Sequence, residues 1–429
     1  MGEIISSKAK WIGEVPSSWN ILQPRRLFTL RREPEREDDI QLTPSQKYGV
    51  LPQTKYMEVT GSRVVLNLTG NTMQHVEPGD FISHLRTFQG GLELARQVGR
   101  VSPAYTVVTP RPGVNPEFFK YVLKSGGYIS QIASVTDQLR DGQSMRFPEF
   151  NQTWLPLPPT LEQQQIADYL DHETAEIDAF IANLRDLIQL SMERAKKVAD
   201  ENLTQGIARE NSIRTLLGRI IRINEGQVDP RLPQYQDMAL IAPNHIQSRS
   251  GQIIGLESAV QQGAESGKYL ATKGQVLYSK IRPALMKAAI APVSCLCSAD
   301  MYAIDGEEEW VSNAYLLEYL LSPEFENYAV TMSDRVAMPK LNRDTLNAAP
   351  ISLPPLRLQG DIAARNQRNR SDVDNLVTEI ETLIQLALER RAALITAVVT
   401  GQIDVTAKHK PAAEQLEDDV AQGLHREYA

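Results

Sequence analysis

The chain of 429 residues has little cysteine: only Cys295 and Cys297, without a second Cys or His pair at zinc-binding spacing. This argues against both a disulfide framework and a structural zinc site, and it favours a reducing, cytoplasmic setting. No stretch approaches the ~18 apolar residues of a membrane span, and the first twenty residues lack the apolar run of a signal peptide. We therefore expect a soluble cytoplasmic protein without a membrane partner.

Catalytic motifs are also missing. The sequence contains no Asn-Pro-Pro-Tyr or Asp-Pro-Pro-Tyr run, no Gly-rich turn between strand and helix, no Walker lysine motif and no nuclease-like cluster of carboxylates and lysine. His75, His84 and His245 have no ligands near them at metal-binding spacing, and we predict them to be packing or polar surface residues. The acidic run 33–39 is predicted to be a solvated loop. We expect no catalytic residue, no metal and no cofactor bound by this chain.

Charge is distributed unevenly, although the net charge is -8. Residues 1–153 carry 18 basic and 15 acidic side chains, whereas residues 154–210 carry 5 basic and 11 acidic ones. The acidic excess therefore lies mainly in one segment, and the rest is close to neutral or mildly basic. This excludes a uniformly basic nucleic-acid-coating protein but allows a specific reader with focused cationic patches.

A long internal duplication is the most informative feature that is present. The 51 residues from Leu157 align without gaps with those from Leu353, at a constant offset of 196, and 15 of the pairs are identical. The identical pairs include the Leu-Pro-Pro at both starts and Leu-Ile-Gln-Leu from Leu187 and Leu383. Because this period far exceeds the ~20–50 residues of solenoid repeats, it indicates duplication of a whole domain with its helix.

Each copy is predicted to form a long helix, since helix formers continue without proline up to Gly206 or Gly401. A helix of ~30 residues would be a rigid spacer ~45 Å long. Apolar residues alternate four and three apart, which is typical of a coiled-coil seam. Packing of each helix on its own domain is the alternative, but two matched copies favour mutual, antiparallel pairing. The predicted pairing residues are Ile177, Ile181, Leu184, Ile188 and Val198 in the first copy and Val373, Val377, Ile380, Ile384, Leu394 and Val398 in the second.

The segments between the helices contain short β-branched or aromatic runs separated by Gly and Pro, which predicts mixed α/β domains with long loops. They resemble each other faintly, since residues 79–86 parallel 274–282 and residues 116–123 parallel 313–321. The predicted fold class is α/β (α+β), with a pseudo-twofold internal duplication. The predicted parts are a first globular domain (1–153), a first helical region (154–210), a second globular domain (211–352), a second helical region (353–405) and a disordered tail (406–429).

At this point the chain resembles the specificity subunits of type I restriction-modification systems, the HsdS family. The nine residues from Trp11 to Trp19 are similar to that family's start, and Leu-Pro-Pro at Leu157 followed by Leu-Glu-Gln-Gln-Gln-Ile-Ala at Leu161 resembles the start of its conserved helix. The second helical region departs from the pattern, because the segment from Leu356 lacks the Glu-Gln pair. The resemblance covers residues 11–405.

The resemblance implies two target recognition domains, each reading one half of a split site in double-stranded DNA. The paired helices would set the gap between the halves and hold two methyltransferase subunits, and restriction subunits could join them. S-adenosylmethionine and ATP with Mg²⁺ would then serve the partners. Two alternatives stay open: an adaptor that binds no DNA, and a self-contained DNA methyltransferase or nuclease.

Candidate DNA-binding residues are loop cations and amides, because phosphates attract Arg and Lys while Arg, Asn and Gln discriminate base edges. Arg86 and Arg282 are the strongest pair, since both follow equivalent strand-like segments. The candidates are Arg86, Gln89, Arg96, Arg100, Arg140, Gln143, Ser144 and Arg146 in the first globular domain and Lys280, Arg282, Lys287, Arg335, Lys340 and Arg343 in the second.

Overall fold

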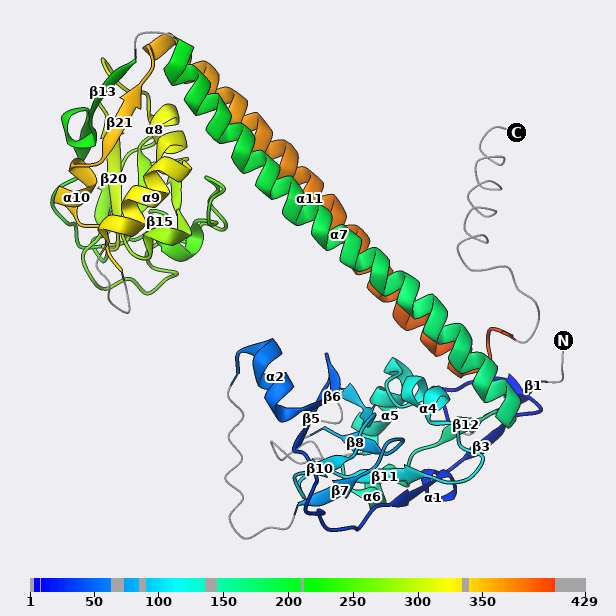
Figure 1. Cartoon of the computed structure of the whole chain (residues 1–429). Helices are drawn as coiled ribbons and strands as arrows, with labels where there is room; N and C mark the ends of the chain where they lie inside the picture. The colour runs from blue at the N-terminus through cyan, green and yellow to red at the C-terminus, as the bar shows by residue number, and fades with distance from the viewer. Residues whose placement is uncertain are drawn as a thin grey trace, which may run out of the picture. The chain divides into compact units, whose positions relative to one another are not determined.

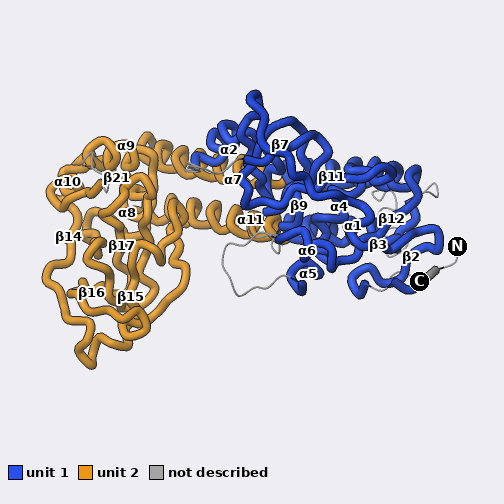
Figure 2. The backbone as a smooth tube through the Cα atoms, turned by 90° about the horizontal axis from the view of Figure 1, so that it is seen from below, with its two compact units in different colours: residues 1–183, 383–429 blue, residues 184–382 orange. Residues whose placement is uncertain are grey.

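The structure is a computed structural model that describes residues 4–7, 9–62, 73–84, 90–135, 145–209, 212–333 and 339–405. The chain divides into two compact units, residues 1–183 with 383–429 and residues 184–382 (Figure 2). This division passes through both long helices, so each unit contains one globular domain and part of each helix (Figure 1). No described helix combines the length and the hydropathy that a membrane span requires.

The globular domain of the first unit is built on a four-stranded antiparallel sheet of order β4-β11-β8-β9. Its core contains Phe28, whose ring meets Phe81 and Phe119 edge to face at centroid distances of 5.9 and 5.3 Å. The sheet strands are β4 (Phe28–Leu30), β8 (Phe81–Ser83), β9 (Leu92–Leu94) and β11 (Val107–Pro110). The other elements are β1 (Ile4–Ser6), β2 (Glu14–Pro16), β3 (Asn20–Leu22), α1 (Pro24–Leu27), β5 (Leu42–Ser45), β6 (Gly49–Pro52), α2 (Gln53–Thr60), β7 (Gln74–Val76), β10 (Gly99–Val101), α4 (Pro116–Val122), α5 (Gly126–Val135), α6 (Phe147–Phe150) and β12 (Leu155–Leu157).

The second unit contains a four-stranded antiparallel sheet of order β14-β20-β17-β18 and a three-stranded sheet of order β15-β19-β16. Cys295 and Cys297 lie in the central strand of the smaller sheet and are buried, free thiols. The strands are β13 (Ile213–Leu216), β14 (Ile221–Ile223), β15 (Leu240–Ile241), β16 (Tyr269–Ala271), β17 (Val276–Ser279), β18 (Ala288–Ile290), β19 (Cys295–Cys297), β20 (Met301–Gly306) and β21 (Pro350–Leu353). The helices are η1 (Leu217–Arg219), η2 (Pro243–His245), η3 (Pro283–Leu285), α8 (Asn313–Leu320), α9 (Pro323–Met332) and α10 (Arg343–Asn347).

The two globular domains share one sheet topology. Strands β4, β11, β8 and β9 correspond in order to β14, β20, β17 and β18, and helices α4, α5 and α6 correspond to α8, α9 and α10. The segments 79–86 and 274–282, which resemble each other in sequence, contain the corresponding strands β8 and β17. The α/β fold class and the internal duplication are therefore confirmed.

Two long helices, α7 (Thr160–Arg209, 50 residues) and α11 (Leu356–Val399, 44 residues), follow the two domains. At 1.5 Å per residue they are ~75 and ~66 Å long. Both helices are longer than the ~30 residues considered from the sequence, because each continues without interruption over its whole length. Gly360 lies in the first turn of α11, where a glycine disturbs helix continuity little.

The helices pair in antiparallel orientation, as predicted. In the first unit Arg391 forms a bidentate ion pair with Asp178 at 2.9 and 3.1 Å. In the second unit the amide of Asn202 donates to Asn366 at 2.8 Å. Among the predicted pairing residues Ile181, Leu184, Ile380 and Val398 are buried, and Ile177, Ile188, Val198, Val373, Val377, Ile384 and Leu394 are half-buried.

Candidate nucleic-acid interface and docking surfaces

A group of cations lies directly after β17 in the second domain. Ile281 and Lys340 form an isolated antiparallel β-bridge. The bridge is flanked by two backbone hydrogen bonds of 2.8 Å, from Arg282 N to Pro339 O and from Leu341 N to Lys280 O. This pairing brings Lys280, Arg282 and Lys340, three of the predicted DNA-binding residues, onto two adjacent segments. We call these three residues the β17 cation cluster.

The cluster is open to solvent. Arg282 and Lys340 are exposed, and their side chains form no hydrogen bond or ion pair with the residues the structure describes. Lys280 is half-buried, with its ammonium 5.4 Å from the centre of the Tyr302 ring. Arg282 has a φ of 47°, a left-handed conformation that non-glycine residues adopt rarely and often at functional positions. Two exposed cations on a constrained backbone can meet phosphates without breaking an internal contact.

The other described candidates in the second domain are held within the protein. Lys287 donates to the carbonyl of Pro243 at 2.5 Å. Arg343 pairs with Glu225 at 2.7 Å and also donates to the carbonyl of Asn224 at 2.9 Å. Both side chains join neighbouring segments of the domain.

In the first domain, Arg96 forms an ion pair with Glu117, and Arg100 pairs with Glu35 at 2.6 Å. Arg146 is exposed at the start of α6. The structure therefore brings no cation cluster together from the described candidates of this domain. Arg86, Gln89, Arg140, Gln143, Ser144 and Arg335, and the predicted tail 406–429, lie outside the described residues.

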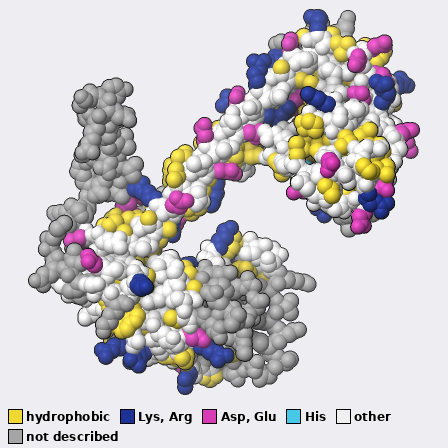
Figure 3. Space-filling model, turned by 180° about the vertical axis from the view of Figure 1, so that it is seen from behind, with side chains coloured by type: hydrophobic (Ala, Val, Ile, Leu, Met, Phe, Trp, Pro, Cys, Tyr) yellow, Lys and Arg dark blue, Asp and Glu magenta, His cyan; other side chains and the backbone are white. Residues whose placement is uncertain are grey.

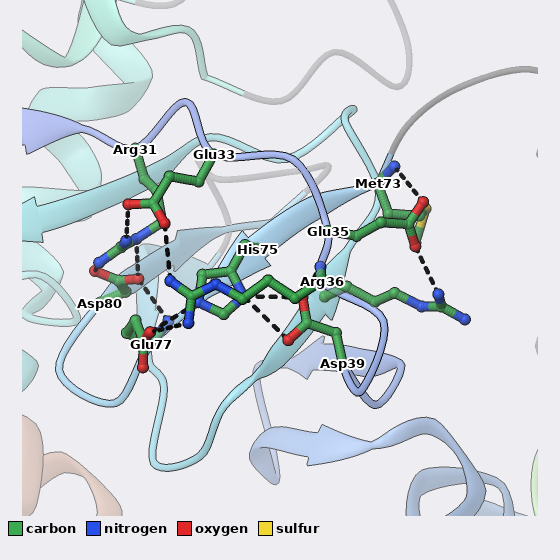
Figure 4. A network of polar contacts seen from close by, with 10 residues as sticks. Arg31, Glu33, Glu35, Arg36, Asp39, Met73, His75, Glu77 and Asp80 are labelled. Carbon is green, nitrogen blue, oxygen red and sulfur yellow. Dashed lines mark hydrogen bonds and ion pairs between the residues drawn. The ribbon is translucent and has the colours of Figure 1, made fainter.

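His75 is buried and lies in a network of ion pairs in the first domain that extends to the surface (Figure 4). Its Nδ1 is 2.8 Å from a carboxylate oxygen of Asp39, and its Nε2 is 2.8 Å from one of Glu77. Arg36 pairs with Glu77 at 2.8 Å, and Arg31 pairs with Asp80 at 2.5 Å. The segment 33–39 is thus partly built into the domain, and the prediction of a solvated acidic loop was wrong for Asp39, which is buried.

These contacts change how His75 titrates. Burial lowers the pKa of His75, but hydrogen bonds to Glu77 and Asp39 outweigh that effect and raise it above the ordinary value. The pKa of Glu77 is lowered, mainly by its hydrogen bond to His75. His84 is likewise buried, 3.0 Å from Glu93. His75 and His84 are therefore packed inside the first domain, which is one of the two outcomes that the sequence predicted for them. Among the described residues no group of three or more His, Cys, Asp or Glu side chains could hold a metal ion.

A buried glutamine fastens the start of α7 to the first domain. The backbone N–H of Asn115, the N-cap of α4, donates to Gln163 Oε1 at 2.8 Å. The Nε2 of Gln163 donates to the carbonyls of Gly113 and Pro158 at 3.1 and 2.8 Å. All its polar atoms are therefore used, which explains how a glutamine can be buried here.

Gln359 has the same role at the start of α11. The N–H of Ser312, the N-cap of α8, donates to its Oε1 at 2.9 Å. Its Nε2 donates to the carbonyls of Trp310 and Pro354 at 2.9 and 3.0 Å. The second helix thus keeps the glutamine that matters structurally, although it lacks the Glu-Gln pair. Gln163 and Gln359 are an identical pair in the alignment of the two repeats, but neither residue was among the predicted site residues.

Each domain also contacts its helix two to three turns further on, and the contacting groups differ between the two units. In the first unit the hydroxyl of Tyr121 donates to Asp171 at 2.5 Å and lies 3.1 Å from Thr174 Oγ1. In the second unit Arg370 forms a bidentate ion pair with the buried Glu318. Arg370 lies 196 positions after Thr174, so the two contacts are equivalent in place but not exchangeable.

Each unit carries an exposed apolar patch on its helices. The first patch consists of Phe180, Leu383 and Leu386, and the second consists of Leu376, Leu187 and Leu190. These side chains are 36–62% exposed, and hydrophobic side chains are visible along the helices in Figure 3. The two patches are equivalent at the offset of 196, residue by residue. The repeat of four and three residues also includes Ser191 and Ala387, so all six residues directly precede a seam position and the three of each unit lie on one flank of the helix pair.

Comparisons with known proteins agree with this architecture. Residues 218–390 match the profile of the type I restriction modification DNA specificity domain. The chain is 26% identical over 276 residues to the Type I restriction enzyme EcoDI specificity subunit of Escherichia coli. That alignment covers 58% of this chain and 62% of the relative, so it spans less than two thirds of the relative's length.

A solved structure concerning complex assembly and conformational transition of the type I R-M system contains a chain with the same fold. The two chains are 15% identical with a TM-score of 0.66, and the match covers 91% of this chain and 99% of the other. The HsdS subunit from Thermoanaerobacter tengcongensis matches with 16% identity, a TM-score of 0.47 and coverage of 91% of this chain and 98% of the other. The likeness at a TM-score of 0.66 supports two globular domains connected by paired helices as a known arrangement.

Proposed function

We propose that this chain, a member of the specificity subunits of type I restriction-modification systems, selects the DNA sequence on which partner subunits act in the cytoplasm. Each globular domain reads one half of a bipartite site, and the helix pair separates the halves. The chain itself is non-catalytic, and S-adenosylmethionine and ATP with Mg²⁺ serve the partners. The observation that carries this proposal is the repeated unit of one α/β domain followed by one long helix.

DNA contact in the second domain is assigned to the β17 cation cluster. Arg282 and Lys340 are exposed and without described partners, so they can neutralise phosphates at no internal cost. The net charge of -8 does not oppose this assignment, because counterion release depends on local cations at the DNA surface.

Partner docking is assigned to the two apolar patches. An exposed cluster of large apolar side chains on a helix marks an interaction surface. Since Phe180, Leu383 and Leu386 are equivalent to Leu376, Leu187 and Leu190, the chain offers the same surface twice. We therefore expect two copies of one methyltransferase subunit on each chain, with restriction subunits joining the assembled complex.

The direct test is single-molecule mapping of methylated adenines in the native cells, before and after deletion of the gene, together with purification of the chain with its partners. Loss of one split methylation motif and recovery of a methyltransferase subunit would support the proposal. Unchanged methylation with a non-methyltransferase partner would instead favour the adaptor, which binds no DNA.

A second experiment addresses the β17 cation cluster. In the purified complex, Arg282→Ala with Lys340→Ala should weaken binding to the specific duplex and reduce the slope of log affinity against log salt by about one to two, because each lost phosphate contact removes about one unit. Arg231→Ala is the matched control, because Arg231 is exposed but paired with Asp229 at 2.8 Å. An unchanged slope in the double variant would reject this assignment.

A further inference from the structure

The two ends of the helix pair differ at one equivalent place in the seam. In the second unit Asn202 Nδ2 donates to Asn366 Oδ1 at 2.8 Å, and Asn366 Nδ2 donates to the carbonyl of Ala199 at 3.3 Å. Asn366 is fully buried. The residues equivalent to Asn202 and Asn366 at the offset of 196 are Val398 and Leu170, which are buried together in the core of the first unit. A polar pair at one end thus replaces an apolar pair at the other.

This difference distinguishes the native pairing from pairing between identical helices. If α7 paired with a second α7 in the same antiparallel register, Asn202 would face Leu170. If α11 paired with a second α11, Asn366 would face Val398. Each arrangement would leave a buried amide without its partner, whereas pairing of α7 with α11 matches amide with amide and apolar with apolar.

A second contact acts in the same direction on α7. Asp178 pairs with Arg391, and the residue equivalent to Arg391 is Ala195. A pair of two α7 helices would therefore place Asp178 opposite an alanine and form no such ion pair, whereas a pair of two α11 helices would place Arg391 opposite Asp374, the equivalent of Asp178, so this contact disfavours α7 pairs alone. The ion pair is exposed and contributes less than the buried amides, so the Asn pair is the main discriminator.

We propose that Asn202 and Asn366 make the two helices select each other and reject copies of themselves. A single polar pair in an otherwise apolar seam is known to fix partner choice and register at some expense of stability. As a consequence, the helix that follows a first domain always pairs with a helix that follows a second domain. When two chains meet during folding, α7 of one chain is thereby prevented from pairing with α7 of the other, and α11 with α11.

The test uses the full chain with one reporter, Arg185→Cys. In a homotypic pair of α7 helices Asn202 faces Leu170, so residue 185 faces residue 187 and lies within one turn of its own copy, where two cysteines can form a disulfide, whereas in the native pair it faces α11. The native Cys295 and Cys297 are buried, and burial raises their thiol pKa values to about 11 and about 12, so they react slowly after folding. The chain is unfolded, refolded at high concentration and then oxidised, and disulfide-linked dimer is measured.

The reporter chain should give little linked dimer. Adding Asn202→Val with Asn366→Leu, which copies the apolar pair of the first unit, should raise the linked fraction about tenfold or more, because unpaired buried amides no longer penalise homotypic pairs. Leu170→Asn with Val398→Asn makes both ends polar and should also raise it. This second variant keeps the test decisive if the first does not fold. No rise in either variant that folds would overturn the proposal.

The matched control is Asn369→Leu. Asn369 also donates across the helix pair, at 2.9 Å, but its acceptor is the backbone carbonyl of Ala195. Every helix copy offers such a carbonyl, so this contact cannot distinguish α11 from α7. Asn369→Leu should leave the linked fraction at the level of the reporter chain. A rise equal to that of the Asn202 and Asn366 variant would attribute the effect to general weakening of the pair, against the proposal.

Discussion

At the residue scale, Gln163 and Gln359 show how one side chain can connect a recognition domain to a helix. Each is buried and accepts the N–H of a helix N-cap while donating to two carbonyls. The N-cap belongs to α4 or α8, and the glutamine to α7 or α11. The glutamine therefore fixes the orientation of each domain relative to the helix that follows it. Under the proposed function, this orientation matters for recognition of two separated half-sites.

We predict that Gln163→Ala or Gln359→Ala destabilises the corresponding domain by about 1–3 kcal/mol, since one buried and two partly buried backbone groups lose their partner. Chemical unfolding followed by circular dichroism measures the change. Gln164→Ala is the control, because Gln164 is exposed and should change stability by less than about 0.5 kcal/mol. Equal effects at Gln163 and Gln164 would contradict the role assigned to the buried amide.

His75 makes the stability of the first domain depend on pH. Because its pKa is raised above 6.5 in the folded protein, the contribution is fully present below that value and is lost as pH rises through the folded pKa. We expect the wild type to lose stability relative to His75→Asn as pH rises from about 6.5 through the raised pKa of His75 in the folded protein. Thermal unfolding of both proteins across this range measures the difference, and parallel pH profiles would show that His75 does not bind its proton more tightly when folded.

The sequence could predict only part of these residue-scale features. Arg282 was predicted as a DNA-binding residue because it follows a strand-like segment that has a counterpart in the first domain, and it is exposed after β17 in the structure. The partners of His75 could not be found, since Asp39 lies 36 positions away and approaches only through the fold. Spacing along the chain detects ligands on one strand or helix, whereas this network depends on tertiary contacts.

At the element scale, the coiled-coil period predicted the helix pair because seam residues repeat regularly in both copies. The period did not predict the apolar patches, since leucines at these positions are also typical of an ordinary amphipathic helix. The exposed fractions separate the two groups: Ile181 is 3% exposed and its neighbour Phe180 is 49% exposed. A pattern gives the spacing of apolar residues, but only packing shows which of them remain uncovered.

We predict that Phe180→Asp with Leu386→Asp removes one methyltransferase subunit from the complex and leaves the other bound. The charges are placed on exposed positions, so the chain should still fold, whereas an apolar interface loses affinity strongly when it must bury a carboxylate. Mass measurement of the purified complex should fall by one subunit. Leu187→Asp with Leu190→Asp should have the same effect through the other patch.

Met192→Asp serves as the control for both pairs of variants. Met192 is 55% exposed but follows a seam residue, so it lies on the opposite flank. This variant should retain two subunits. Loss of both subunits from either double variant would indicate one shared docking site and contradict the assignment of two.

At the scale of the whole molecule, the duplication gives each domain its own helix and each helix its partner. Strand order, domain contacts and docking patches all recur, while Glu318 with Arg370 and Asn202 with Asn366 differ from their counterparts. Regular features are the ones that a sequence comparison within the chain could find. The differences are what make the two halves of the chain non-equivalent.

If the paired helices set the distance between half-sites, lengthening both should lengthen the unread gap. We predict that inserting seven residues after Asn183 in α7 and seven after Ile384 in α11 keeps the seam in register and adds ~10.5 Å. At 3.4 Å per base pair this allows the spacer to grow by up to about three base pairs, less where the helical phase of DNA opposes it. Mapping of methylated sites measures the spacer. Insertion in α7 alone is the control and should abolish methylation, because it breaks the register. An active double insertion with the original spacer would show that the helices do not set the gap.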